Sequence, residues 1–252
     1  LMEYEIEAEF MHEFYRNGSR FPAYGSIVAA GANACCLHYG ENNVRMQDGE
    51  LLLIDAGCEL EGYASDITRT FPVNGKFSGP QKDVYEITLA AHQAAFDLAR
   101  PGVAWHEIHD AATKVLAQGM LDLGLLQGSL DGVLESGSYK QFYMHRTGHW
   151  LGLDVHDCGS YIEPSEADHT TERQDPLTGQ SVTERPSRIL RPGMVLTIEP
   201  GLYVRPGSDA PEPFHGIGIR IEDDAIVTDS GCELITRGVP VAPDEIEALM
   251  RA

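Results

Sequence analysis

The strongest constraint on how this chain can fold is a carboxylate that directly follows a run of mostly apolar residues, because the pattern occurs twice. Asp55 follows the run LLLI, and Glu199 follows the run VLTI. Two further acids, Asp66 and Glu222, lie in later segments with apolar flanks. Such runs are typical of buried strands, where an ionised carboxylate is unfavourable unless a positive charge or a metal ion compensates for it.

Ordinary ion pairs are one explanation for these acids. Arg69 lies close to Asp66 in the sequence, and Arg220 lies two residues before Glu222, where it would project to the same face of a strand. Taken alone, each acid could therefore be structural. Four acids in apolar strands with few basic residues nearby favour a cluster that binds cations.

Histidines gather in the segment MHRTGHWLGLDVHD, which covers residues 144–157. His145, His149 and His156 lie there beside apolar residues. A single buried histidine is most often a satisfied core residue, but three so close together, in a chain that also carries the acids, favour a functional site. Asp154 and Asp157 are expected to make only local hydrogen bonds.

Four carboxylates and one imidazole form a hard, oxygen-rich set of ligands. Such a set suits Mn²⁺ or related ions, with Co²⁺, Zn²⁺ and Fe²⁺ as alternatives, and does not suit a structural zinc site. Two metal ions about 3.5–4 Å apart are the usual arrangement in hydrolases of this kind. Asp223 and Asp224, next to Glu222, are expected to be exposed and to bind no metal.

The composition excludes several other functions. The 252 residues include 39 acidic and 18 basic ones, for a net charge of -21, and no cationic patch for a nucleic acid is visible. No apolar run is long enough to cross a membrane. The 5 cysteines contain no CxxC pair and are expected to be small buried residues, which fits a reducing, cytoplasmic setting without a disulfide framework.

Amphipathic and turn patterns divide the chain into elements. Helices are expected over 1–17, 80–98, 105–121 and 243–250, and strands over 26–30, 33–38, 51–55, 63–71, 194–198 and 215–227. The polar residues 159–190 are expected to form a long surface excursion. The helix over 1–17 has no start signal before it, so we expect the chain to be a fragment that lacks an N-terminal part.

The segments LLLIDAG and MVLTIEPG share one design: an apolar strand, a carboxylate, one small or proline residue, and then glycine. Each is followed by a second strand that carries another acid. This internal echo favours a pseudo-twofold α+β domain in which two hairpin-like units bring their acids together at the centre.

A family resemblance rests on five motifs, which occur in the order LLLIDAG, ASDITRTFPV, HWLGLDVHD, VLTIEPGLY and GIGIRIEDD. They resemble the metallopeptidases of the pita-bread fold, which include methionine aminopeptidase, aminopeptidase P, prolidase and creatinase. The segments LHYGEN and DITRTFPVNGKF are most similar to aminopeptidase P, which removes an N-terminal residue that precedes proline. The resemblance covers nearly all of residues 1–252 and implies one catalytic domain with an α+β pita-bread fold, in which a curved antiparallel sheet is flanked by helices.

The resemblance also implies ligands for two divalent metal ions per subunit, which we expect to be Mn²⁺. Asp55 would chelate one ion and His149 would bind the other. Asp66 and Glu222 would bridge both ions. Glu199 would bind metal and act as the general base for the bridging water.

Other residues match family positions around the metals. His38, His145 and His156 would hold the substrate and take part in catalysis, and His156 would contact the scissile carbonyl. Tyr203 would lie near the metals and the substrate. Arg220 would bind the carboxylates, and not the metal ions, and would orient them.

The function that this resemblance implies is hydrolysis of N-terminal Xaa-Pro bonds, in peptides with proline at the second position, by attack of a metal-bridging hydroxide. The alternatives are a prolidase that acts on Xaa-Pro dipeptides, a creatinase-like amidine hydrolase, and a non-catalytic pita-bread module that binds a peptide or protein. In the family an N-terminal domain helps to build oligomers, so the full-length protein is expected to be a homo-oligomer, a dimer or a tetramer. Tyr24 has two explanations, a substrate contact or a core tyrosine.

Overall fold

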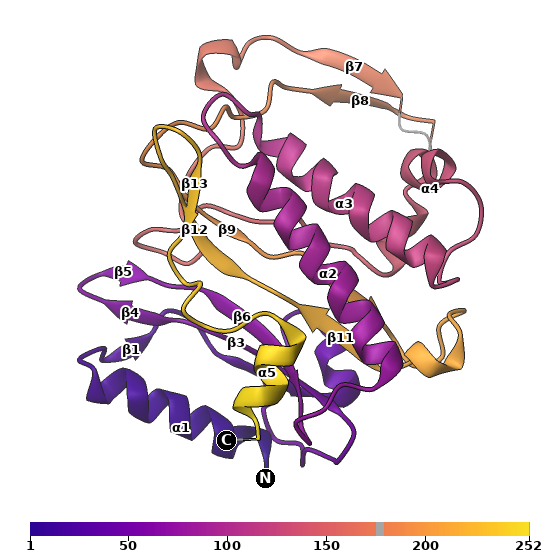
Figure 1. Ribbon diagram of the computed structural model, residues 1–252. Coiled ribbons are helices and arrows are strands. Elements are labelled where there is room, and N and C mark those ends of the chain that lie inside the picture. Colours follow the sequence, from indigo (N-terminus) through magenta and orange to yellow (C-terminus); the bar gives the residue numbers. More distant parts are fainter. Residues whose placement is uncertain (175–178, 252) are drawn as a thin grey trace.

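A computed structural model describes residues 1–174 and 179–251, with helices on the outside of small antiparallel sheets (Figure 1). The helices are α1 (Glu3–Arg16), α2 (Gly79–Leu98), α3 (Trp105–Asp122), α4 (Leu130–Ser136) and α5 (Pro243–Leu249). The strands are β1 (Phe21–Pro22), β2 (Ile27–Ala30), β3 (Leu51–Ala56), β4 (Cys58–Leu60), β5 (Tyr63–Ala64), β6 (Ile67–Pro72), β7 (Thr171–Gln174), β8 (Ser181–Glu184), β9 (Val195–Ile198), β10 (Gly201–Val204), β11 (Ile217–Arg220), β12 (Asp223–Val227) and β13 (Cys232–Leu234).

Two groups of short antiparallel strands form the centre of the molecule. In the first group β3 pairs with β2 and β6; in the second, β12 pairs with β9 and β13, and β10 pairs with β11. The groups are joined where the Glu222 N–H donates to the Thr68 carbonyl at 3.1 Å and the Arg220 N–H donates to the Thr70 hydroxyl at 3.2 Å. This junction sets the two units side by side, as the internal echo in the sequence predicts.

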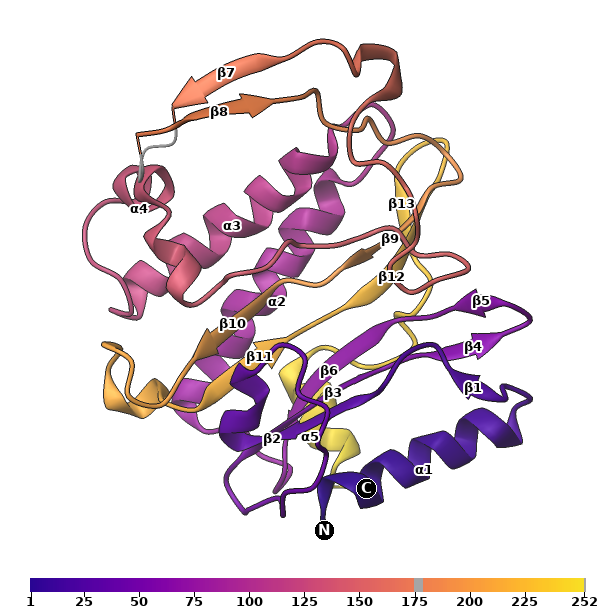
Figure 2. The same cartoon turned by 180° about the vertical axis from the view of Figure 1, so that it is seen from behind.

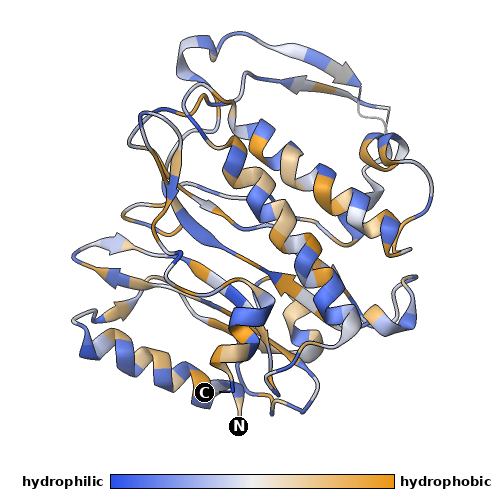
Figure 3. Ribbon diagram, viewed as in Figure 1, coloured by the Kyte–Doolittle hydropathy of each residue, from blue (hydrophilic) through white to orange (hydrophobic). Residues whose placement is uncertain are grey.

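Helices α2 and α3 lie next to each other, and α2 packs against β9, β10 and β11 of the second strand group (Figure 2). A capping box begins α2, because the Ser78 hydroxyl accepts the Gln81 N–H and the Gln81 side chain accepts the Ser78 N–H. Buried residues such as Val84 and Leu116 pack with Ile219 in the main core. Figure 3 shows hydrophobic and hydrophilic residues alternating along the helices, as their amphipathic patterns require.

Most of the expected elements are confirmed, but one strand is wrong. The helices over 1–17, 80–98, 105–121 and 243–250 are present, as are the strands over 26–30, 51–55 and 194–198. Residues 33–38 form no strand, and 31–35 are instead a 3₁₀ helix, η1 (Gly31–Cys35). The chain turns there because the buried Glu3 carboxylate accepts the Ala30 N–H at 2.7 Å and the Asn33 side-chain amide at 3.2 Å.

The long strands expected over 63–71 and 215–227 are each broken at an acid. The first break falls at Asp66, between β5 and β6, and the second at Glu222, between β11 and β12. At Glu222 the chain changes partner, because β11 pairs with β10 whereas β12 pairs with β9. Both acids are thereby released from the strict alternation of side chains along a regular strand.

Residues 159–174 and 179–190 run over the surface, where β7 and β8 form an exposed antiparallel pair (Figure 1). Residues 175–178 of this segment lie outside the described residues. The buried Glu163 anchors the excursion, since its carboxylate accepts the Ile189 N–H at 3.0 Å and pairs with Arg191 at 2.6 Å.

Two expectations from composition can be compared with the structure. Within residues 1–174 and 179–251, no helix has the length and apolar character needed to cross a bilayer. The expected burial of all cysteines holds only for Cys35, because Cys58 and Cys232 are partly buried and Cys36 and Cys158 are exposed.

The expectation that Asp223 and Asp224 are exposed is also wrong, because their exposed fractions are 0% and 2%. The Asp223 carboxylate accepts from Arg69 at 2.7 Å and from the Thr236 hydroxyl at 2.8 Å, and it pairs with Arg237 at 2.9 Å. Arg69 therefore compensates for Asp223 and leaves Asp66 without the partner that the sequence suggested.

A histidine completes this buried network. His92 Nε2 lies 3.2 Å from Asp223 Oδ2. Burial alone would raise the pKa of Asp223, but the neighbouring His92 and Arg69 outweigh it and lower the pKa to about 2. The network ties β6, α2 and β12 together around one carboxylate that has two guanidinium partners.

Replacing Asp223 by asparagine should lower the free energy of unfolding by about 3–5 kcal/mol at pH 7, because Arg69 is left buried without its counter-charge. The pKa of Asp223 falls from 3.8 to about 2 on folding, so this stabilisation is present above about pH 4 and is lost as the pH falls through 2. Urea denaturation over this pH range measures both effects. The exposed Asp229→Asn control should match the wild type, and an unchanged D223N at pH 7 would contradict this account of the network.

Candidate metal centre

The four acids of the sequence pattern converge where the two strand groups meet. Asp55 lies in β3, Asp66 directly precedes β6, Glu199 directly follows β9, and Glu222 lies between β11 and β12. Asp55, Asp66 and Glu222 are buried, with exposed fractions of 8%, 5% and 1%. Each acid thus sits at the end of a strand, where the backbone is fixed and the side chain is free to turn toward the junction.

His149 completes this group. Its Nε2 atom lies 3.4 Å from Asp66 Oδ2 and 3.7 Å from Glu199 Oε1. One ligand atom from each of Asp66, His149 and Glu222 lies within 4.8 Å of the other two, a spacing that could hold a metal ion. The backbone that precedes His149 packs closely against β9, because a Cβ on Gly148 would lie only 2.0 Å from the Thr197 carbonyl oxygen.

Neutral donors and one guanidinium hold the carboxylates in place. The Tyr24 hydroxyl contacts both Asp55 Oδ1 and Asp66 Oδ1. The Thr68 hydroxyl donates to Glu222, and Arg220 donates to Asp55. Because a phenol has a single proton, Tyr24 can satisfy only one of its two carboxylate contacts at a time.

The electrostatics of the group show a deficit of positive charge. Burial, followed by repulsion from Asp66 and Glu199, raises the pKa of Glu222 well above its usual value. Burial also raises the pKa of Glu199 to about 7, against the charges of His149 and Arg220. Burial raises the pKa of Asp55 even though Arg220 opposes it.

The pKa of His149 responds to the same surplus of negative charge. Burial lowers this pKa, but Asp66 and Glu199 outweigh burial and raise it to about 9. Buried carboxylates that favour protonation fit the binding of divalent cations, because cations would supply the missing charge.

Three more candidate histidines lie at different depths. His145 Nδ1 lies 3.8 Å from Glu199 Oε2, and burial together with the charge of Arg220 lowers its pKa to about 3. The ring of His156 stands edge-on to His149 with centroids 4.3 Å apart. His38 is exposed, in the loop that follows η1.

Tyr203 and Arg220 connect His145 to the acids. The Tyr203 hydroxyl lies 2.9 Å from His145 Nε2 and accepts from Arg220 at 3.1 Å. Arg220 in turn donates to Asp55 rather than to Glu222, its neighbour in sequence. The structure therefore brings the candidate residues other than His38 into one connected region, while the individual roles of all of them stay predictions.

The sequence pattern missed some residues of this region. Thr68 lies two residues after Asp66 and is paired with Asp55 across β3 and β6. Its spacing from Asp66 along the strand is the feature of the sequence that could have identified it. Asp224 accepts the Asp66 N–H at 3.2 Å, and burial raises its pKa to about 7. Nothing local in the sequence distinguishes Asp224 from an exposed acid. From the sequence, Tyr24 is expected to be either a substrate contact or a core tyrosine, and its contacts with Asp55 and Asp66 are not expected.

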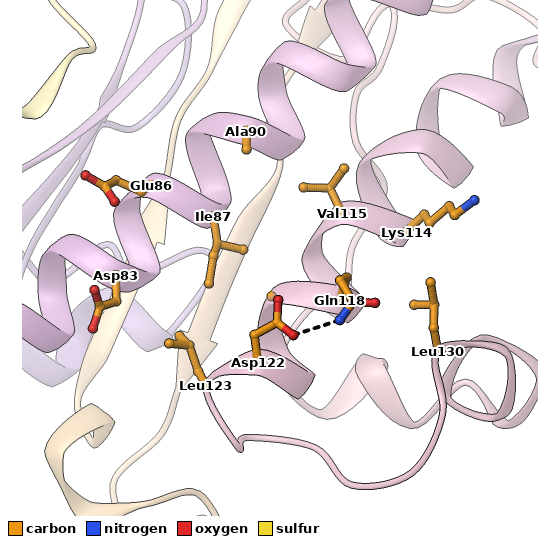
Figure 4. A pocket seen from close by; sticks show the side chains of 11 residues that line it. Asp83, Glu86, Ile87, Ala90, Lys114, Val115, Gln118, Asp122, Leu123 and Leu130 are labelled. Atoms are coloured by element: carbon orange, nitrogen blue, oxygen red, sulfur yellow. Dashed lines mark hydrogen bonds between the residues drawn. The ribbon is translucent and has the colours of Figure 1, made fainter.

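A cavity of about 690 Å³ lies elsewhere, between α2, α3 and α4. Figure 4 shows its lining side chains, among them the apolar Ile87 and Val115 and the acidic Asp83, Glu86 and Asp122. None of the candidate site residues lines this cavity.

Comparison with known proteins gives consistent matches. A model of metallopeptidase family M24 matches residues 1–229. The Xaa-Pro aminopeptidase of Haemophilus influenzae is 48% identical over 248 residues, which are 98% of this chain and 53% of that protein. The Xaa-Pro dipeptidase of Homo sapiens is 39% identical over 272 residues, which cover 99% of this chain and 53% of that protein.

A solved structure supports the fold independently. The aminopeptidase PepP of Pseudomonas aeruginosa matches 100% of this chain and 52% of its own with a TM-score of 0.90 and 50% sequence identity. The α+β fold class expected from the sequence is therefore confirmed. The chain spans about half the length of the curated relatives it matches.

The charge deficit predicts how metal-free protein responds to pH. The pKa of Glu199 rises from 4.5 to about 7 on folding, so its neutral form stabilises the fold below pH 4.5 and this contribution is lost as the pH rises through 7. After treatment with chelator, the wild type should lose stability relative to Glu199→Gln across this interval, as measured by thermal unfolding. The exposed Glu212→Gln should track the wild type, and a constant difference between wild type and E199Q would count against the deficit.

Proposed function

The chain belongs to metallopeptidase family M24, and on that premise we propose that it hydrolyses the bond between an N-terminal residue and a following proline. The observation that carries the proposal is the buried group of acids with Asp66, His149 and Glu222 within ligand distance. The 48% identity to an Xaa-Pro aminopeptidase supports the choice of substrate.

Two divalent ions, which we propose to be Mn²⁺, would be held by Asp55, Asp66, His149, Glu199 and Glu222. Oxygen ligands with one imidazole suit ions of this hardness. When bound, the ions would activate a water molecule and polarise the scissile carbonyl.

Within this scheme Glu199 acts as the general base. Its carboxylate lies next to the other proposed ligands, with Oε1 3.7 Å from His149 Nε2, so it can take a proton from the attacking water and pass it to the departing proline nitrogen. His145 is neutral, so it can accept a hydrogen bond from Tyr203 at 2.9 Å. Arg220 contacts both Tyr203 and Asp55 and fixes their relative positions.

His156 and His38 would meet the substrate at the exposed side of the site. Both are exposed, whereas the acids lie deeper. A histidine that donates to the scissile carbonyl would stabilise the negative charge that develops there.

Proline at the second position requires a dedicated site. Its tertiary amide has no N–H and its φ angle is fixed, so it does not fit peptidases that bind an extended backbone through that donor. A site that acts through the N-terminal amine and the carbonyl does not need that donor.

A prolidase activity is the second candidate, because the chain is 39% identical to the Xaa-Pro dipeptidase of Homo sapiens. The same ligands and the same base would serve it. The two activities differ in the length of peptide that the site accepts.

The proposal is tested by incubating the Mn²⁺-loaded protein with an Xaa-Pro-Yaa tripeptide, an Xaa-Pro dipeptide and an Xaa-Ala-Yaa tripeptide. We expect release of the N-terminal residue from the first, loss of activity with chelator, and little cleavage of the alanine peptide. Preferential cleavage of the dipeptide would establish the prolidase alternative.

In the same assay His156→Ala should keep its metal but lose about 10²-fold in kcat. The exposed His12→Ala, on α1, serves as the matched control. No cleavage of either proline peptide by metal-loaded wild type would refute the proposed function.

A further inference from the structure

Behind the candidate metal centre, hydrogen bonds link α3 to the segment that carries His145 and His149. Thr147 in this segment is buried, with an exposed fraction of 2%. Its hydroxyl oxygen lies 2.9 Å from His109 Nδ1 and 2.6 Å from the Tyr143 hydroxyl. On the far side of the imidazole, His109 Nε2 lies 3.4 Å from the Thr113 hydroxyl. The four side chains form one continuous row.

The direction of these hydrogen bonds can be assigned from the protons that each member carries. Burial raises the pKa of Tyr143 well above its usual value, so the phenol keeps its proton. Either oxygen can donate in the bond between Tyr143 and Thr147, and donation by the phenol gives its buried proton an acceptor. In that arrangement the single proton of Thr147 goes to His109 Nδ1. This requires a neutral imidazole with its proton on Nε2, facing Thr113. Burial lowers the pKa of His109 to about 4, so the ring is neutral at pH 7.

The backbone of Thr147 holds the proposed base. Its carbonyl accepts the Glu199 N–H at 2.7 Å, and the His149 carbonyl accepts the Thr197 N–H at 3.0 Å. Gly148, between them, leaves no room for a side chain against β9. A displacement of Thr147 would therefore move the backbone that carries Glu199.

The same row reaches His145 through an aromatic contact. The Tyr143 ring meets the His145 ring edge-on, with centroids 5.0 Å apart. The Tyr143 hydroxyl is held by Thr147, so the orientation of this ring also depends on the row.

His109 itself does not face the substrate. The cavity beside it, lined by Trp105, His109, Thr147 and Leu196 among others, has a volume of about 10 Å³. That volume is close to the least that a single water molecule needs. An effect of His109 on the reaction would therefore pass through its neighbours, by the hydrogen bond to Thr147 and by the contact with the Tyr143 ring, whose centroid lies 5.7 Å away.

We propose that His109 is a positioning residue of the hydrolytic site, which through Thr147 sets the places of Glu199 and His145. This inference rests on the proposed peptidase function. The Nδ1 atom of His109 is the important acceptor, because it binds the Thr147 hydroxyl and fixes the Thr147 side chain. With its side chain fixed, Thr147 also holds its carbonyl in place for the Glu199 N–H.

Paired substitutions separate this role from simple packing. Asparagine at position 109 can place an acceptor near the former Nδ1, whereas leucine cannot. Serine at position 147 keeps the hydroxyl, whereas valine replaces it with a methyl group of similar size. The exposed His106→Leu, on the same helix, serves as a control.

With an Xaa-Pro-Yaa tripeptide, His109→Leu and Thr147→Val should lower kcat by about 10–100-fold, since misplaced catalytic groups cost rates of this order. KM and bound Mn²⁺ should stay close to the wild-type values. His109→Asn, Thr147→Ser and His106→Leu should retain most of kcat. If His109→Leu does not fold, the near-isosteric Thr147→Val decides by the same criterion.

Two results would overturn the inference while leaving the peptidase function intact. One is an unchanged kcat in His109→Leu and Thr147→Val. The other is an equal loss in His109→Asn and His109→Leu, which would mean that packing alone matters. A metal-loaded wild type that cleaves no Xaa-Pro peptide would instead remove the proposed function and this inference with it.

Discussion

Mutual repulsion among buried carboxylates is the constraint on which the rest of this structure depends. Asp55, Asp66 and Glu222 lie in the interior with Glu199 beside them, and one guanidinium and one imidazole do not balance their charge. Proteins tolerate such a group when it binds cations or holds protons. The adjacent residues Glu222 and Asp223 illustrate the difference. Both are buried, but Glu222 faces other acids and has a raised pKa, whereas Asp223 faces Arg69 and His92 and has a pKa of about 2.

The network around Asp223 and the group of acids have complementary parts in the architecture. The network joins β6, α2 and β12 and gives its buried carboxylate two guanidinium partners, so it can hold the two strand groups together without any ligand. Hydrogen bonds from Glu222 to Thr68 and from Glu199 to Thr147 then fix the backbone beneath the acids. A rigid frame of this kind holds the mutually repelling carboxylates at ligand distance from one another. It prepares a site for cations, but it lowers the stability of the folded protein when no cation is bound.

The sequence predicts much of this arrangement because local chemistry determines it. Amphipathic periodicity is enough to locate the long helices, and an acid after an apolar run is enough to locate the centre. The errors arise where contacts with residues distant in sequence determine the secondary structure or the burial. The strand expected over 33–38 is replaced by η1 because Glu3 captures the backbone there. Asp223 looks exposed in sequence because Arg69 and Arg237, its partners, come from other elements. The contacts of Tyr24 and Thr68 with the acids likewise depend on tertiary register.

The central claim is that the acids form a site for two divalent cations, and calorimetric titration of chelator-treated protein with Mn²⁺ at pH 7 addresses it most directly. We expect about two ions per chain. Proton release should accompany binding, because Glu199 and Glu222 hold protons in the metal-free protein. Asp66→Asn should bind far more weakly. An absence of binding, or equal binding by Asp66→Asn and the wild type, would contradict the account.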